Sequence, residues 1–173
     1  INNRLRGVSR MESLEIILER AAKEYTDVEK DAFAAEKNAL YADSLRTMSE
    51  KDVSEDVRLT LKTLKEKGVR IAVGSSSKNA PTILERIGLY DEFDAISDGN
   101  NITKSKPDPE VFLKAAEFLG LTPKDCLVVE DAKAGIDAGK AGGFATAGIG
   151  EAAAYEKSDY RLTKLSDLLS VLD

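Results

Sequence analysis

Short apolar runs alternate with amphipathic segments from about Val53 to the end of the chain, and this alternation constrains the fold more than any other feature. The apolar runs have the length and composition of buried strands, whereas the segments between them repeat their apolar residues at helical spacing. Strands that alternate with helices are typical of a parallel sheet with helices on both faces. The sequence therefore predicts a doubly wound parallel α/β core, a Rossmann-like fold, over residues 53–173. We expect its strands at 69–74, 93–98, 126–131, 144–150 and near 160, and its helices at about 55–67, 79–87, 108–120, 132–143 and 164–171.

Residues 1–52 contain no convincing strand and follow a helical pattern instead. Ser9 and Glu12 form the S-x-x-E sequence of a capping box, which predicts that a helix begins there. A second helix is expected from about Asp27 to Met48. The two helices would lie antiparallel as a small cap beside the core. Each has apolar residues near one stripe: Leu14, Ile17, Leu18 and Ala21 on the first, and Phe33, Leu40, Tyr41, Leu45 and Met48 on the second.

The charge balance and the rare residues exclude several classes of function. The chain has 25 basic and 31 acidic residues, a net charge of −6, so no basic face is available for a nucleic-acid backbone. No apolar run approaches the roughly 20 residues that a membrane-spanning helix needs, and no signal peptide is visible, so we expect a cytoplasmic protein. Histidine is absent, and Cys126 is the only cysteine. Acid–base chemistry would therefore fall to carboxylates, Lys, Tyr or residues outside this chain.

Three polar clusters follow predicted strands, at the edge where parallel sheets bind ligands. The first is "VGSSSKN", residues 73–79, in a loop that enters a helix. Its hydroxyls and free backbone N–H groups suit a phosphate, and Ser75 comes first after the strand, where a transferring phosphoryl group would lie. Ser77, Lys78 and Asn79 could reach a second anionic group. Plain N-capping by serine explains the same loop about equally well.

The second and third clusters are weaker when each is taken alone. Lys106 precedes Pro107, which favours an extended backbone and holds the ammonium outside the following helix. It could balance phosphoryl charge, although a lone loop lysine is usually only solvated. Glu130 and Asp131 end an apolar strand and could ligate Mg²⁺, which takes one or two carboxylates. A surface role, or capping of the next helix by Asp131, is the alternative.

Together, in this order and spacing, the three clusters resemble the motifs of the haloacid dehalogenase superfamily of phosphoryl-transfer enzymes. Ser75 matches the second motif, Lys106 the third, and Glu130 with Asp131 the acidic fourth. The resemblance implies that Ser75 and Lys106 are catalytic and that the two carboxylates hold Mg²⁺.

The segments "LRGVSRMESLEIIL", "EKNALY" and "GSSSKNAPTILERIGL" narrow the resemblance to the β-phosphoglucomutase branch of that superfamily. In this branch a helical cap closes over a sugar phosphate, and phosphoryl moves through a bisphosphate and an aspartyl-phosphate enzyme. The resemblance implies that the substrate is β-glucose 1-phosphate or a similar sugar phosphate, bound by a monomer without membrane contact. Its implied contacts are Gly7, Val8, Arg10, Ser13, Lys37, Ser77, Lys78 and Asn79. Lys37 also projects from the apolar stripe, for which snorkelling is an equally good explanation.

The first motif of the superfamily, a D-x-D sequence after the central strand, has no counterpart before residue 53. We therefore expect the chain to be a partial version of a longer protein, with 1–52 as a partial cap and 53–173 as a core that lacks its first strand. Alone it would not catalyse covalent phosphoryl transfer. Two alternatives stay open: a phosphatase that acts on another small phosphate ester, and a binding module without catalysis if Ile1 is the true start.

Overall fold

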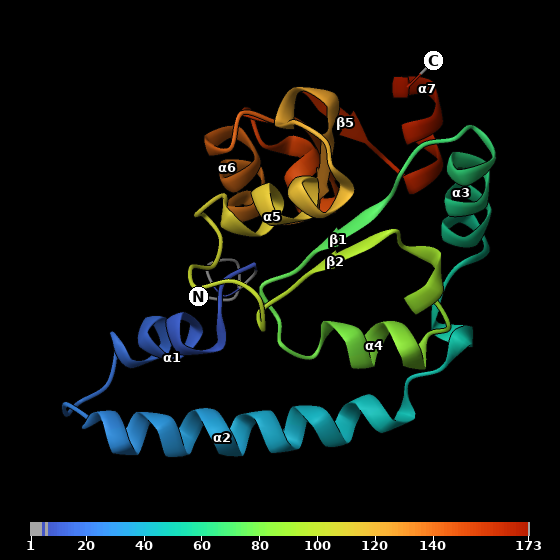
Figure 1. Ribbon diagram of the computed structural model, residues 1–173. Helices are drawn as coiled ribbons and strands as arrows, with labels where there is room; N and C mark the ends of the chain where they lie inside the picture. Colours follow the sequence, from blue (N-terminus) through green and yellow to red (C-terminus); the bar gives the residue numbers. More distant parts are fainter. Residues whose placement is uncertain (1–4, 6, 173) are drawn as a thin grey trace.

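The computed structural model describes residue 5 and residues 7–172 of the chain. Within them the predicted α/β core is confirmed, because parallel strands alternate with helices along the sequence (Figure 1). The strands are β1 (Ala72–Gly74), β2 (Ala95–Ser97), β3 (Leu127–Glu130), β4 (Ala145–Ile149) and β5 (Tyr160–Leu162). The helices of the core are α3 (Glu55–Glu66), α4 (Ala80–Arg86), α5 (Glu110–Leu119), α6 (Lys133–Ala141) and α7 (Leu168–Leu172).

The strands form two parallel sheets whose carboxyl ends meet. In one sheet β1 pairs with β2, and Gly74 lies opposite Ser97. In the other, β4 lies between β3 and β5 and is parallel to both. Gly74 and Glu130, the last residues of β1 and β3, line the same pocket. Polar residues that follow either strand are thereby delivered to one place.

An apolar slot of about 430 Å³ lies between β1 and β3. Ala72 of β1 and Val129 of β3 are among the residues that line it. Within the described part of the chain, β1 pairs only with β2 and β3 only with β4, so neither edge along the slot has a neighbouring strand. Helix α5 spans the slot, because Phe112 packs against Val128 of β3 while α5 also contacts β1 and β2.

The helices cover both faces of the sheet, as expected for alternating strands and helices. Val128 packs with Phe112 of α5 and Ala138 of α6 on one face. Its neighbours Leu127 and Val129 pack on the other face, with α3 and α7. This alternation follows from the two-residue period of a strand, which turns successive side chains to opposite sides. A third cluster joins α3 and α4 to β1 and β2.

The cap consists of α1 (Arg10–Leu18) and α2 (Asp27–Ser44), and Figure 1 shows α2 running past α4 on the side away from α5. The predicted capping box is confirmed: Ser9 Oγ accepts from the backbone N–H of Glu12, and the Glu12 carboxylate accepts from that of Ser9. Thr26 and Glu29 form a second capping box, which begins α2. No helix of the described residues is long and apolar enough to cross a membrane.

The apolar stripe expected along α2 is mostly open to solvent. Leu45 is buried, but Leu40 is 70% exposed, and Phe33 and Tyr41 are also exposed. Within α2, which contacts α1, the buried residue is Ala34. The second helix also ends at Ser44, four residues before the predicted Met48, and a 3-10 turn follows.

Candidate active site

The carboxyl ends of β1 and β3 border a pocket of about 480 Å³ that gathers all three predicted clusters. Ser75 enters it from the loop after β1, Lys106 from the loop before α5, and Asp131 from the end of β3. These residues are between 25 and 56 positions apart in the sequence (131 − 106 and 131 − 75). The parallel arrangement brings them together because each follows or faces a strand end at the same edge. The pocket is lined by Gly7, Val8, Gly74, Ser75, Ser76, Ser77, Lys106, Val129, Glu130, Asp131 and Ile149.

Lys106 and Glu130 form a buried ion pair at the floor of this pocket. Their side chains are 6% and 8% exposed. Lys106 Nζ donates to a Glu130 carboxylate oxygen and also to the carbonyl oxygen of Gly74, at 3.0 Å. It lies 4.7 Å from the centre of the Phe112 ring, a cation–π contact. An ammonium held from three directions is a fixed positive charge, which suits it to an anionic group.

Space for the Glu130 carboxylate comes from a glycine on the neighbouring helix. A Cβ built on Gly135 of α6 would lie 2.1 Å from Glu130 Cδ, closer than any real contact. The Glu130 carboxylate also accepts from the backbone N–H of Ala132, at 3.3 Å. Glu130 is therefore fixed by both Lys106 and the start of α6, rather than free at the surface.

Asp131 differs from Glu130 in exposure and in role. It is exposed, and it lines the pocket. The alternative that it caps the following helix is wrong, because α6 begins at Lys133 and its N-cap residue is Ala132, without a side-chain cap bond. Among the described residues, no group of three or more His, Cys, Asp or Glu could hold a metal ion. Two adjacent carboxylates match Mg²⁺ only where substrate and water oxygens complete the shell.

The serines after β1 shape their own loop. The backbone N–H of Ser77 donates to Ser75 Oγ at 3.2 Å, and that of Asn79 donates to Ser77 Oγ at 3.1 Å. These bonds use lone pairs only, so each hydroxyl keeps its own proton as a donor. Asn79 is the N-cap residue of α4 and makes no side-chain cap bond. The alternative for this loop was N-capping of the helix by a serine. No serine occupies the N-cap position of α4.

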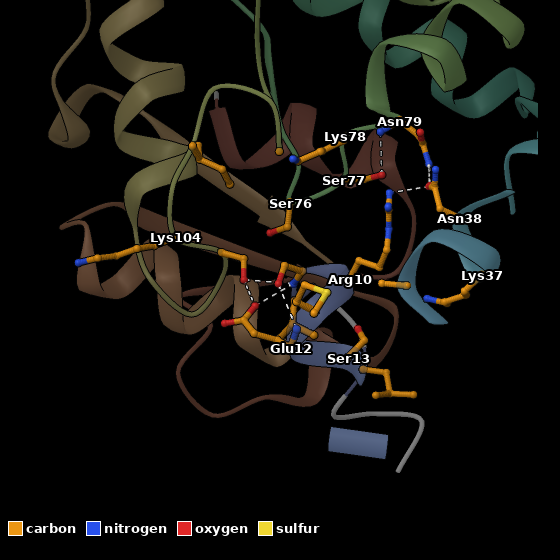
Figure 2. A pocket seen from close by; sticks show the side chains of 18 of the residues that line it. Arg10, Glu12, Ser13, Lys37, Asn38, Ser76, Ser77, Lys78, Asn79 and Lys104 are labelled. Carbon is orange, nitrogen blue, oxygen red and sulfur yellow. Dashed lines mark hydrogen bonds between the residues drawn. The ribbon is translucent and has the colours of Figure 1, made fainter. Parts of the chain in front are cut away.

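A second, larger cavity of about 1200 Å³ lies between the cap and the core. Arg10, Ser13 and Lys37 border it from the cap, and Lys78 and Asn79 border it from the core (Figure 2). Val8, Ser76 and Ser77 line both this cavity and the carboxyl-end pocket. The two spaces therefore meet, and the predicted residues divide between them. We call the pocket at the strand ends the inner pocket and the larger space the outer cavity. The residues that line the inner pocket alone include Gly7, Ser75, Lys106, Glu130 and Asp131.

One residue that was missed in the sequence organises the outer cavity. Asn38 Oδ1 accepts from Arg10 Nη2 at 2.5 Å and from Asn79 Nδ2 at 3.1 Å, so α1, α2 and the α4 loop meet at one atom (Figure 2). Lys37, its neighbour in sequence, is exposed at the cavity wall. No local pattern marks Asn38. Its position directly after Lys37 was the only available signal.

Further polar contacts that were missed in the sequence attach the cap to the core. The Glu12 carboxylate accepts from Ser105 Oγ, and Ser76 Oγ donates to the carbonyl oxygen of Gly7 at 2.9 Å. Burial raises the pKa of Glu12, but hydrogen bonds from Ser105 and Ser9 outweigh it and leave the pKa below its ordinary value of 4.5. Glu12 is therefore a stable anion in the attached cap at neutral pH.

The chain is similar to known proteins in sequence and in structure. A family model described as haloacid dehalogenase-like hydrolase matches residues 4–143. The β-phosphoglucomutase of Bacillus subtilis is 39% identical over 170 residues, which cover 97% of this chain and 75% of that protein. A crystal structure of β-phosphoglucomutase from Clostridium difficile superposes with a TM-score of 0.89 at 35% identity, covering 96% of this chain and 76% of that one. A phosphorylated carbohydrates phosphatase of Thermotoga maritima is 29% identical, over 83% of this chain and 65% of that protein.

Proposed function

This chain belongs to the haloacid dehalogenase-like hydrolases, and from that premise we propose that it is part of a β-phosphoglucomutase. The reaction is the interconversion of β-glucose 1-phosphate and glucose 6-phosphate through a bisphosphate. Relatives named β-phosphoglucomutase support the reaction class. The observation that carries the proposal is the pair of joined spaces, each of which is lined by at least one cationic side chain and by hydrogen-bond donors.

A mutase of this kind needs two anion sites. It must hold one phosphate of the substrate while a phosphoryl group is transferred at the other end. The inner pocket offers Lys106 and Ser75 for the reacting phosphoryl group. The outer cavity offers Arg10, Lys78 and the side-chain amide of Asn79 for the distal phosphate. Lys37 can reach the same cavity from α2, and Ser13 borders it from α1.

In the inner pocket each residue has a distinct task. The fixed ammonium of Lys106 balances the charge of the phosphoryl oxygens, and the Ser75 hydroxyl donates a hydrogen bond to one of them. Asp131 and Glu130 would hold Mg²⁺, with Asp131 directed to the pocket and Glu130 kept in place by Lys106. When bound, this ion would neutralise charge on the transferring group. None of these residues is proposed as the carboxylate that accepts the phosphoryl group.

A phosphatase of the same family is the second candidate, since the relative from Thermotoga maritima carries that name. The two activities differ in the acceptor, which is water in a phosphatase and a sugar hydroxyl in a mutase. Closure of the cap would exclude water and favour the hydroxyl. Both activities would use the inner pocket, so a change in the outer cavity is needed to distinguish them.

Replacing Arg10 by Ala in the native enzyme tests the proposal. A planar guanidinium can grip two phosphate oxygens at once, so we expect its loss to lower mutase turnover more than about tenfold, equivalent to some 1.4 kcal/mol of transition-state stabilisation. Hydrolysis of para-nitrophenyl phosphate, which has no distal phosphate, should change little. Arg46→Ala is the matched control, because Arg46 is an exposed arginine just after α2, paired with Asp43 and outside the cavity lining.

The pattern of effects separates the candidates. An equal fall in both activities would mean that Arg10 supports the cap rather than the substrate. No change in either activity would remove the second anion site from this cavity and favour the phosphatase.

A further inference from the structure

The side-chain oxygen of Asn38 is the meeting point of three segments of the outer cavity. Arg10 lies 28 residues before it and Asn79 lies 41 residues after it, yet both donate to the same Oδ1. Only the carbonyl oxygen of an amide can accept from two donors, so these bonds fix the orientation of the Asn38 side chain. Asn38 is itself half-buried and lines the cavity.

Both donors keep capacity beyond the bonds to Asn38. A guanidinium has five N–H groups, and the amide nitrogen of Asn79 has two. The other charged groups on the walls are Lys37, Lys78 and Lys104, opposed by Asp31, Asp108 and Glu12. Because Asn38 is neutral, it holds Arg10 without cancelling its charge.

From this arrangement we propose that Asn38 is a positioning residue of the distal anion site. It holds the Arg10 guanidinium and the Asn79 amide side by side before a ligand arrives, so that a phosphate meets donors that are already assembled. Ordering two long or mobile side chains in advance removes part of the entropy cost of binding. This inference rests on the proposed function only in taking the anion to be the distal phosphate of a sugar phosphate.

An uncharged amide at this position also has a consequence for which substitutions work. A carboxylate would keep both hydrogen bonds and would bind Arg10 more strongly, as an ion pair. It would also bring a negative charge to the place where the phosphate must lie. Asp at residue 38 should therefore preserve the cap while it impairs the anion site, whereas a purely structural role would tolerate it.

The test is titration of the native enzyme with glucose 6-phosphate, and separately with inorganic phosphate, by calorimetry. We expect Asn38→Ala to weaken binding of both about tenfold, and Asn38→Asp to weaken it further, although Asp retains the acceptor atoms. Glu36→Ala, at an exposed site on the same helix outside the cavity, is the control for damage to α2. The Arg10→Ala, Asn38→Ala double variant should lose less affinity than the product of the two single losses, because Asn38 acts partly through Arg10 and partly through Asn79.

Two outcomes would overturn the inference. One is Asn38→Asp binding like the wild type, which would indicate a structural role. The other is independent, multiplying losses in the double variant, which would mean that Asn38 acts without Arg10. A wild-type enzyme that binds inorganic phosphate but not glucose 6-phosphate would instead overturn the proposed function, and the phosphate titrations would still decide the role of Asn38. Binding of neither ligand would overturn both.

Discussion

The cap and the core of this protein are stabilised in different ways. In the core, Val111, Ile136 and Leu162 are almost completely buried. Three apolar clusters connect the helices of the core to its strands. In the described part of the cap, large apolar residues such as Phe33 and Leu40 remain exposed. Burial of apolar surface is the dominant favourable term in folding, so the core holds itself together and the cap contributes little of this kind.

Hydrogen bonds attach the cap to the core instead. Glu12 binds Ser105, Gly7 binds Ser76, and Asn38 binds Asn79. Each neutral bond of this kind contributes about 0.5–1.5 kcal/mol, and the bond to the charged Glu12 up to about 3 kcal/mol, so we expect that the attachment can open without unfolding the core. From this difference we infer that the core is the more rigid part and that the cap can open and close over the cavity between them.

The largest expected effect is a loss of turnover when residues that the core contributes to the inner pocket are replaced. Asp131→Ala should lower turnover about a thousandfold or more, since the proposed Mg²⁺ ligand beside the transferring phosphoryl group is lost. Because Asp131 is exposed and does not cap α6, the melting temperature should fall less than that of Lys106→Ala. Lys106→Ala should be nearly as inactive and also less stable by about 3–5 kcal/mol, because Glu130 is left buried and unpaired. Turnover and thermal denaturation of both variants check this, and an active Asp131→Ala enzyme with a weakened α6 would contradict it.

The next effect compares packing in the two layers directly. Ile136 is 0% exposed in α6, so Ile136→Ala should lower the free energy of unfolding by about 2–5 kcal/mol. Phe33 in α2 is 41% exposed, and Phe33→Ala should cost under about 1 kcal/mol although a larger side chain is removed. Denaturant titration measures both. Equal losses would break the contrast between an apolar core and a polar-attached cap.

A smaller effect concerns one of the attachments. Glu12→Gln replaces a charged acceptor by a neutral one, and it should weaken the contact with Ser105 by about 0.5 kcal/mol, because the carboxylate is partly exposed. Hydrogen exchange should become faster in α1 and stay the same in β3 and β4. Glu36→Gln, exposed on α2, is the control. Faster exchange throughout the core would show that the cap and the core open as one unit.

The smallest effect is the pH dependence of the same contact. The pKa of Glu12 is lower with the cap attached than its ordinary value of 4.5. Its contribution is therefore complete above about pH 4.5 and is lost as the pH falls through the lower pKa of the attached form. Exchange of α1 amides measured from about pH 6 down to pH 3 should show this loss, and Glu12→Gln should flatten it. A loss that begins above pH 5 would assign it to another group.

The alternation of apolar runs and helical segments was enough to predict the fold class and the meeting of Ser75, Lys106 and Asp131, because parallel strands place their ends together. Strand lengths were overestimated. The Asp94 carboxylate accepts from the backbone N–H of Ile71 at 2.8 Å, so β1 begins only at Ala72 rather than at 69. A side chain here takes a bond that a strand ladder would use, and apolar composition does not reveal that.

The contacts that organise the site could not be read from local pattern. The pair of Lys106 with Glu130 joins residues 24 apart, and the contact of Asn38 with Asn79 joins residues 41 apart. In sequence, Gly135 is one of several small residues of α6, yet its missing Cβ makes room for the Glu130 carboxylate. Such contacts depend on how elements approach one another, and spacing within an element says nothing of it.

The slot between β1 and β3 bears on how the protein behaves at high concentration. In the described part of the chain, the two strand edges along the slot have no neighbouring strand, and residues such as Val129 and Phe112 line the space between them. An unpaired edge is a template for any extended apolar segment, including one from another copy of the chain. Preparations with the slot open should therefore self-associate as they are concentrated, and light scattering would follow it. Because apolar association weakens on cooling, the protein should self-associate less when it is stored in the cold.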